Sequence, residues 1–311
     1  MKIIKILPLF GIILFIYLVL KIGITDIFEG LKFVKPSYLF LSIALVIPYI
    51  ILQTLNWTIL LKKQNWKLDF VYLFKVYLIG VFYGAITPGK AGFILKVSYL
   101  ADETGESLSN CSVSIILQRV LDFMALSFLA VIGAGLLISY NSNLFLTLLL
   151  LFFIIISFFL FFMNEDLTRK FLRIIHSNIV PSTMKNSTKE SFNSFYSELP
   201  EIKELVFPFL LAIFNWIYIY TVAYIITLSL SLNVPYFELV SILALTTIVI
   251  LIPITISGFG TREASLLILM SRYNAPLESI ILFSFLMYVI NTLFPASLGL
   301  VFSLIYNRKK I

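Results

Sequence analysis

Long apolar stretches recur along this chain and constrain its fold more than any other feature. They lie at about residues 6–22, 38–61, 71–87, 112–139, 144–163, 205–230, 237–256 and 278–306. Several approach the roughly 20 residues that a helix needs to cross a hydrocarbon core about 30 Å thick. A soluble domain carries about a quarter charged residues, whereas this chain carries 13%. The sequence therefore predicts an all-α, polytopic membrane protein.

The net charge of +7 would suggest nucleic acid in a soluble protein. In a membrane protein, Lys and Arg in short loops instead set the orientation. The basic residues lie in loops and at helix ends, without the interleaved aromatic side chains of a strand-binding groove. We therefore predict no nucleic-acid partner.

Few residues suit covalent chemistry. The only cysteine is Cys111 and the only histidine is His176, so zinc lacks a ligand cluster. Residues 84–91 nearly spell a phosphate-binding loop, but Ala91 stands where a hydroxyl would hold Mg²⁺. We predict no catalytic residue, no metal and no cofactor, and hence a protein that is not an enzyme.

The loop charges predict an orientation in the cell (plasma) membrane. Uncharged linkers at 140–143 and 231–235 suit the outer side, and both termini are predicted to be cytoplasmic. The residues that mark the inside are Lys2, Lys5, Lys62, Lys63, Lys67, Arg308, Lys309 and Lys310. Those that conflict with this orientation are Lys21, Lys32 and Lys35.

We expect one transmembrane domain over residues 1–311, built as two halves. The first half is 1–163 and the second is 205–311. The polar stretch 164–204 between them carries apolar residues at helical spacing, which predicts amphipathic cytoplasmic helices at the interface.

The predicted orientation is satisfied if segments 71–100 and 237–271 each return to the side they entered from. Each contains a break near its middle, and the break residues are Pro88, Gly89, Gly92, Gly258 and Gly260. Two such elements of opposite orientation are the signature of an inverted repeat. We predict about six full spans plus two re-entrant helix pairs, although two full crossings would satisfy the same count.

Charged residues gather at these breaks. Lys90 and Lys96 flank the first break, and Arg262 and Glu263 lie at the second. Broken helices persist in a bilayer only where they line protein or a wet cavity, and the exposed helix amino terminus suits an anion. We predict a substrate site there. The alternative is two ordinary loops whose basic side chains reach for the interface.

Arg119 and Asp122 lie on one face of the segment at 112–139, with Gln118 beside them. Ions within a membrane are costly and face the protein interior. They are candidates for binding a phosphate, and a purely structural ion pair is an equal alternative. Three further polar residues lie in mid-helix, and contacts between helices explain them as well as contact with a substrate does; they are Asn56, Asn215 and Asn291.

Three motifs resemble one family. Residues 87–100 are similar to the "PGGxGExxRxxLL" signature of the lysylphosphatidylglycerol synthase transmembrane (flippase-like) family. Residues 118–122 resemble its "ERxxD" helix, and residues 257–264 resemble its "PGGxGxREA" element. The motifs follow in the same order over nearly the whole chain. The family's two glutamates fall on Phe93 and Gln118 here, so the charge preference for a substrate is expected to differ.

The resemblance implies an inverted-repeat helical domain that moves lipid between leaflets. No soluble aminoacyl-transfer domain follows Ile311, so we do not expect synthesis of lysyl-lipid by this chain. The primary hypothesis is a translocator of a phospholipid or lipid-linked substrate. The alternative is a non-transporting partner of a lipid-modifying enzyme or of a lipid-linked glycosyltransferase. The predicted partners are membrane lipids, and the sequence allows an oligomer.

Overall fold

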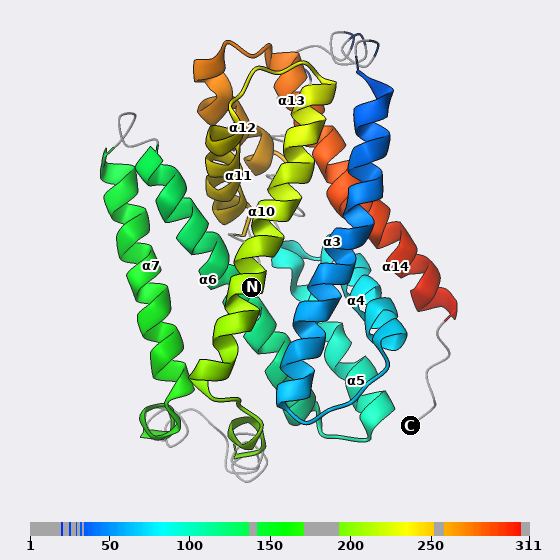
Figure 1. Ribbon diagram of the computed structural model, residues 1–311, viewed down its shortest axis with the longest axis vertical. Coiled ribbons are helices and arrows are strands. Elements are labelled where there is room, and N and C mark those ends of the chain that lie inside the picture. The colour runs from blue at the N-terminus through cyan, green and yellow to red at the C-terminus, as the bar shows by residue number, and fades with distance from the viewer. Residues whose placement is uncertain are drawn as a thin grey trace.

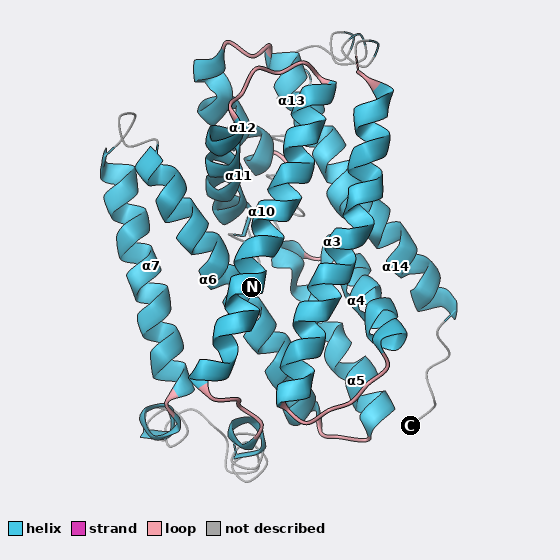
Figure 2. Cartoon of the chain, viewed as in Figure 1, coloured by secondary structure: helices cyan, strands magenta, loops and turns pink. Residues whose placement is uncertain are grey.

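The computed structural model describes residues 34–136, 142–170, 193–251 and 258–305, with the single residues 20, 25, 29 and 32. These parts of the chain are helical, joined by loops, and contain no strand (Figures 1 and 2). The longer helices are α3 (Pro36–Lys63), α4 (Phe70–Ala85), α5 (Lys96–Thr104), α6 (Leu108–Leu136), α7 (Ser142–Met163), α10 (Val206–Ser229), α11 (Tyr236–Leu251), α12 (Thr261–Met270), α13 (Leu277–Tyr288) and α14 (Phe294–Ile305). Shorter elements are the 3₁₀ helices η1 (Pro88–Leu95), η3 (Ile202–Leu205) and η4 (Ser271–Tyr273), and the π turn η5 (Val289–Leu293).

Within these described ranges, five helical segments are long and apolar enough to cross a membrane. They are Pro36–Lys63, Leu108–Leu136, Leu146–Met163, Ile202–Ser229 and Leu277–Ile305. The predicted all-α, polytopic class is therefore confirmed. All of the predicted first span at 6–22 except residue 20, the linker residues 171–192 and the basic tail lie outside the described residues.

Local sequence sets several helix ends. The Asp69 carboxylate accepts a hydrogen bond from the Tyr72 backbone N–H at 2.9 Å and caps the start of α4. Gly105 ends α5 with φ +72°, and its N–H donates to the Ala101 carbonyl at 2.9 Å. A left-handed residue at this position is the usual way to stop a helix. The α4–α5 unit is thus bounded by local signals.

The helix boundaries repeat along the chain. The span Ile202–Ser229 begins and ends 166 residues after Pro36–Lys63 (202 − 36 and 229 − 63). Helix α11 stands in the same relation to α4 (236 − 70 and 251 − 85). The described residues of 36–136 and of 202–302 are therefore two copies of one helical pattern. This offset of 166 residues, called the register below, does not test the predicted halves 1–163 and 205–311, which stay a prediction.

The two copies point in opposite directions. In Figure 1, α4 and α5 have their outer ends at the lower end of the molecule, with η1 near the middle. Helices α11 and α12 have their outer ends at the upper end. The packing follows the same relation, because α3 packs on α10, α4 packs on α14, and α11 packs on α6.

Two glycines make the equivalent contacts in the two copies. A Cβ at Gly133 on α6 would lie 2.8 Å from Ser241 Cα on α11. A Cβ at Gly299 on α14 would lie 2.0 Å from the Leu78 carbonyl oxygen on α4. These glycines are themselves 166 residues apart (299 − 133). Close approach of helix backbones through small residues is typical of membrane proteins.

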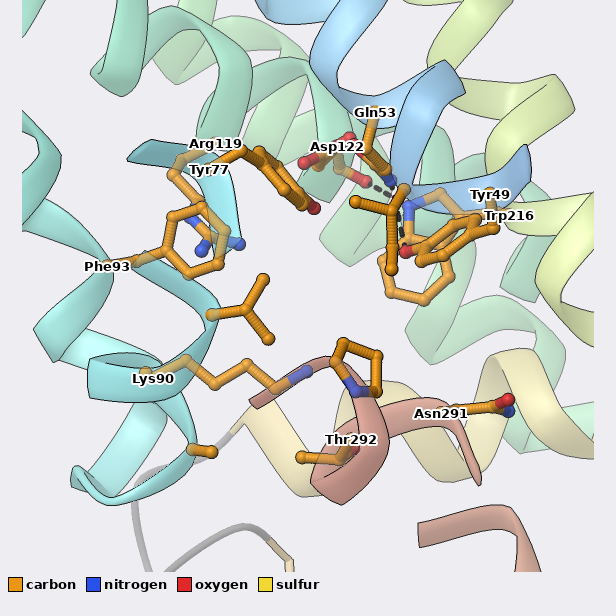
Figure 3. Close-up of a pocket in the computed structure, with 15 residues that line it drawn as sticks. Tyr49, Gln53, Tyr77, Lys90, Phe93, Arg119, Asp122, Trp216, Asn291 and Thr292 are labelled. Carbon is orange, nitrogen blue, oxygen red and sulfur yellow. Dashed lines mark hydrogen bonds between the residues drawn. The ribbon is translucent and has the colours of Figure 1, made fainter. Parts of the chain in front are cut away.

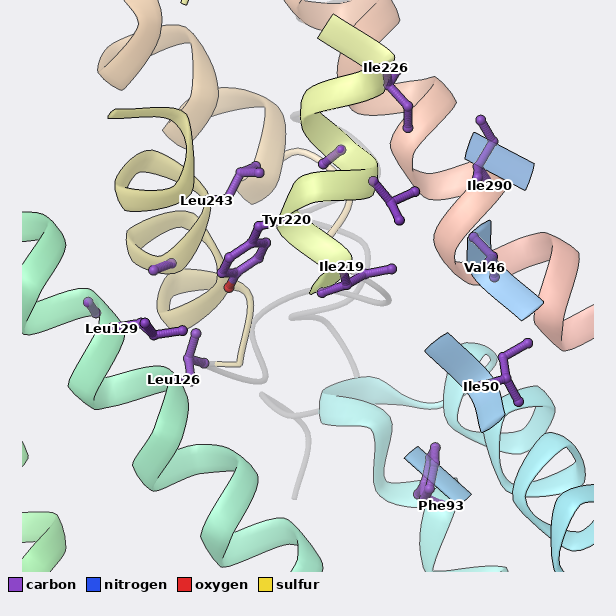
Figure 4. Close-up of a cluster of buried hydrophobic side chains, with 14 of the residues drawn as sticks. Val46, Ile50, Phe93, Leu126, Leu129, Ile219, Tyr220, Ile226, Leu243 and Ile290 are labelled. Carbon is purple, nitrogen blue, oxygen red and sulfur yellow. The ribbon is translucent and has the colours of Figure 1, made fainter. Parts of the chain in front are cut away.

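The apolar core joins both copies. Figure 4 shows Val46 and Ile50 of α3, Leu126 and Leu129 of α6, and Ile219 and Ile226 of α10 among its buried side chains. By contrast, apolar side chains of α7 face outward, and these include Leu146, Leu150, Phe153, Ile154, Phe158 and Leu160. An apolar outer face and an apolar core together are what a bilayer environment requires.

Candidate functional site

A cavity of about 90 Å³ lies among the helices, next to the first break (Figure 3). Its walls come from α3, α4, η1, α6 and α10 and from the η5–α14 region, so both copies contribute. The lining residues are Tyr49, Ile50, Gln53, Tyr77, Val81, Gly84, Ala85, Lys90, Phe93, Arg119, Asp122, Trp216, Asn291, Thr292 and Pro295. This volume holds several water molecules or a small polar group.

The first break is a compact 3₁₀ helix, a form that the sequence did not predict. The Thr87 hydroxyl donates to the Tyr83 carbonyl at 2.8 Å and accepts from the Gly92 backbone N–H at 2.7 Å. A Cβ at Gly92 would lie 2.2 Å from that same carbonyl oxygen, so only glycine fits. Pro88 and Gly89 open this helix. Lys90 follows with φ +58°, a left-handed conformation unusual for a lysine.

Three predicted binding residues line the cavity: Lys90, Arg119 and Asp122. The Arg119 guanidinium lies over the Phe93 ring, 3.7 Å from its centroid. Arg119 Nη2 and Asp122 Oδ1 are buried, and neither atom has a hydrogen-bond partner. Both residues belong to the described part of the chain, where no salt bridge joins them. The structure therefore contains no closed ion pair between Arg119 and Asp122, which was the structural alternative.

Lys96 lies beside the cavity but does not line it. Only 1% of its surface is exposed, and Nζ donates to Gln118 Oε1 at 2.9 Å. The ammonium faces the rings of Trp57, Phe93 and Tyr77, at 4.0, 4.5 and 5.2 Å from their centroids. Such a cage stabilises a desolvated cation. Lys96 thus packs against Phe93, a ring that the Arg119 guanidinium and Tyr77 also contact.

Arg262 and Glu263, at the second break, form a closed network away from the cavity. Arg262 Nη2 lies 2.9 Å from Glu263 Oε1, and Arg262 Nε donates to the Ser284 hydroxyl at 2.7 Å. The Ser284 hydroxyl in turn donates to Glu263 Oε1 at 2.5 Å, and the Gly260 N–H donates to Oε2 at 2.6 Å. Gly258 and Gly260 both have positive φ, as a break requires. This network leaves no free charge for a ligand.

The register of 166 residues relates the two breaks. It pairs Phe93 with Phe259, Lys96 with Arg262, and Gln118 with Ser284. In each copy the cation donates to the paired polar residue of the following helix and faces the paired phenylalanine ring. In the second copy, Phe285 and Tyr288 occupy the positions that are equivalent to Arg119 and Asp122. The charges of the cavity therefore come from the first copy alone.

Of the remaining polar lining, only Asn291 was named from the sequence. Gln53 Nε2 donates to the Tyr49 hydroxyl at 3.1 Å, and Trp216 Nε1 donates to the Asp122 carbonyl at 2.9 Å. Asn291 lies in the π turn, and the sequence allowed either contacts between helices or contact with a substrate for it. The sequence signal that could have identified Gln53 is its position as a polar residue in the middle of an apolar helix. The π turn itself has no such signal in the sequence.

Comparison with known proteins gives a consistent family. The family model described as "Lysylphosphatidylglycerol synthase TM region" matches residues 3–306. A UPF0104 membrane protein of Methanocaldococcus jannaschii is 24% identical over 305 residues, covering 93% of this chain and 90% of the relative. A UPF0104 membrane protein of Methanothermobacter thermautotrophicus is 21% identical over 286 residues, covering 86% and 84%. The chain therefore belongs to the family of the lysylphosphatidylglycerol synthase transmembrane region.

Proposed function

We propose that this protein moves a phosphate-bearing lipid between the leaflets of the cell membrane. The observation that carries the proposal is the cavity with Lys90, Arg119 and Asp122 in its wall. Arg119 Nη2 is a buried nitrogen without a hydrogen-bond partner, which is unfavourable, and a phosphate oxygen is a good acceptor for it. The proposal involves binding and movement of the head group and no covalent step.

The proposed membrane placement puts the lower end of Figure 1 in the cytoplasm. Lys62, Lys63 and Lys67 lie at or just beyond that end of α3, in agreement with the tendency of basic loops to stay inside. The α4–α5 pair then enters from the cytoplasm and the α11–α12 pair from outside, and both are re-entrant. Opposed elements of this kind support alternating access to a central site.

A transport assay with Arg119→Gln tests the proposal. Purified protein is placed in liposomes with fluorescent anionic, zwitterionic or cationic lipids, and transfer between leaflets is followed by quenching of the outer leaflet. We expect Arg119→Gln to slow transfer roughly tenfold or more, because a charge-assisted bond to phosphate is lost. The matched control is Arg272→Gln, since Arg272 pairs with Glu238 outside the cavity.

Equal transfer by the wild-type protein and by Arg119→Gln would contradict the role of the cavity. No transfer above empty liposomes, with folded protein, would contradict translocation. That absence of transfer would favour the hypothesis of a non-transporting partner subunit. Co-purification of the protein with a lipid-modifying enzyme would test this hypothesis.

A further inference from the structure

The cavity holds more unpartnered acceptors than a phosphate alone would satisfy. Gln53 Oε1, Asp122 Oδ1 and Asn291 Oδ1 are buried atoms without a hydrogen-bond partner, and all three residues line it. Carboxylate and amide oxygens only accept hydrogen bonds. A phosphate diester has no donor to offer them. Buried acceptors left unpaired are unfavourable, so the complementary ligand carries donors of its own.

The acceptors and the cations lie on different sides of this cavity. Figure 3 shows Lys90 on η1 and Arg119 beside Phe93 on one side. Gln53 on α3 and Asn291 in the π turn lie on the other, and Asp122 lies on the Gln53 side. This arrangement suits a head group with phosphate at one end and donors at the other. The π turn is contributed by the second copy, and π turns are frequent at functional sites.

Charge decides which donors fit. Two cations and one carboxylate line the cavity, Lys90 and Arg119 against Asp122, which gives a net charge of +1. A head group with phosphate and ammonium adds no net charge and leaves that excess uncompensated. A phosphodiester with hydroxyl groups brings one negative charge and neutral donors. In a partly desolvated site, the neutralising ligand is favoured.

We infer that the cavity selects an anionic phosphodiester lipid whose head group carries hydroxyl donors and no amine. The inference rests on the proposed function and adds the substrate class to it. Lys90 and Arg119 bind the phosphate. Asp122, Gln53 and Asn291 accept hydrogen bonds from the head-group hydroxyls and distinguish this lipid from others of equal charge.

The test compares three lipids that differ in head-group charge and in the donors that the head group carries. Phosphatidylglycerol is a small hydroxyl-bearing diester, phosphatidylmethanol has the same charge without the hydroxyls, and phosphatidylethanolamine carries an amine. We expect the protein in liposomes to transfer phosphatidylglycerol at least about fivefold faster than either of the others, as befits the loss of one or two hydrogen bonds. This comparison uses the wild-type chain and does not depend on a variant.

Asn291→Leu sharpens the test. It removes one acceptor, and we expect it to slow phosphatidylglycerol roughly fivefold while leaving phosphatidylmethanol unchanged. The matched control is Asn215→Leu, because Asn215 is also a buried, unpartnered asparagine but does not line the cavity. The control is expected to keep the preference between the two lipids.

The possible failures are distinguishable. Equal rates for phosphatidylglycerol and phosphatidylmethanol, or equal slowing of both by Asn291→Leu, would overturn the head-group selectivity and leave translocation standing. Faster movement of phosphatidylethanolamine would assign the acceptors to an amine and overturn the inference. Absence of transfer for all three lipids would overturn the proposed function together with it.

Discussion

The cations at the two breaks differ in what surrounds them. Lys96 has a neutral partner and a cage of rings, whereas Arg262 has the Glu263 carboxylate and the Ser284 hydroxyl. Arg119 has the face of Phe93 and leaves Nη2 unpaired. Because burying a charge without a partner is unfavourable, Arg119 has more to gain from an anionic ligand than Lys96 or Arg262. Lys96 and Arg262 hold structure in place.

Glu263→Gln tests the structural role assigned to the second break. The substitution keeps the volume but removes the charge that compensates Arg262, which is 4% exposed. We expect the free energy of unfolding to fall by about 3 kcal/mol, as when one partner of a buried pair is removed. Thermal unfolding in detergent measures it. The control is Glu165→Gln, which breaks the exposed pair with Arg169 and should cost less than about 1 kcal/mol. Similar losses in both variants would contradict a special role for the buried network.

At the scale of elements, the sequence located the helices well because their signal is local. The predicted segments 71–87 and 237–256 correspond to α4 and α11, and each of these helices begins one residue earlier than predicted. Charged and glycine-rich stretches interrupt apolar runs wherever a membrane helix stops. The form of the first break was not predicted, because a 3₁₀ helix held by Thr87 depends on one side chain meeting two backbone groups.

The close packing of α14 against α4 can be tested with a substitution at Gly299. Gly299→Ala would place a Cβ 2.0 Å from the Leu78 carbonyl oxygen, so α14 and α4 must move apart. We expect a loss of about 3 kcal/mol in unfolding free energy, at the upper end for overpacking, together with slower lipid transfer because Pro295 of α14 lines the cavity.

Gly105→Ala is the control for that substitution. Gly105 has φ +72° and no neighbouring atom within 4 Å of a built Cβ, so alanine there meets only backbone strain of about 1 kcal/mol. A loss for Gly299→Ala no larger than for Gly105→Ala would show that the α4–α14 contact is not tight.

For the whole molecule, the sequence predicted the opposed breaks but not how the site is shared. It placed Lys90, Lys96, Arg119, Asp122, Arg262 and Glu263 in one candidate set, and the structure brings three of them to the cavity. The division follows from long-range packing, since α3 and the π turn complete the cavity from positions far away in the sequence. The register of 166 residues was present in the sequence as paired residues such as Phe93 and Phe259. The register can be recognised only when the structure shows which helices are equivalent.

The opposed arrangement of the two copies makes a prediction for single cysteines. Lys67→Cys and Glu106→Cys flank the α4–α5 pair, and Asn233→Cys and Ser271→Cys flank the α11–α12 pair, at positions that are exposed. Native Cys111 is buried, which keeps the background labelling low. If both pairs are re-entrant, an impermeant maleimide labels the first two from the cytoplasmic side only and the last two from the outside only.

The two arrangements differ in which cysteines share a side. Full crossings by segments 71–100 and 237–271 would place Lys67→Cys and Glu106→Cys on opposite sides of the membrane, and this result would exclude re-entrant pairs. The reverse assignment, with the first two labelled from outside, would keep the pairs but invert the protein in the membrane. Lys62, Lys63 and Lys67 argue against inversion, because basic residues beside a span favour the cytoplasm. The side of the membrane from which the α4–α5 pair enters also determines the leaflet from which a lipid head group first reaches Lys90 at the first break.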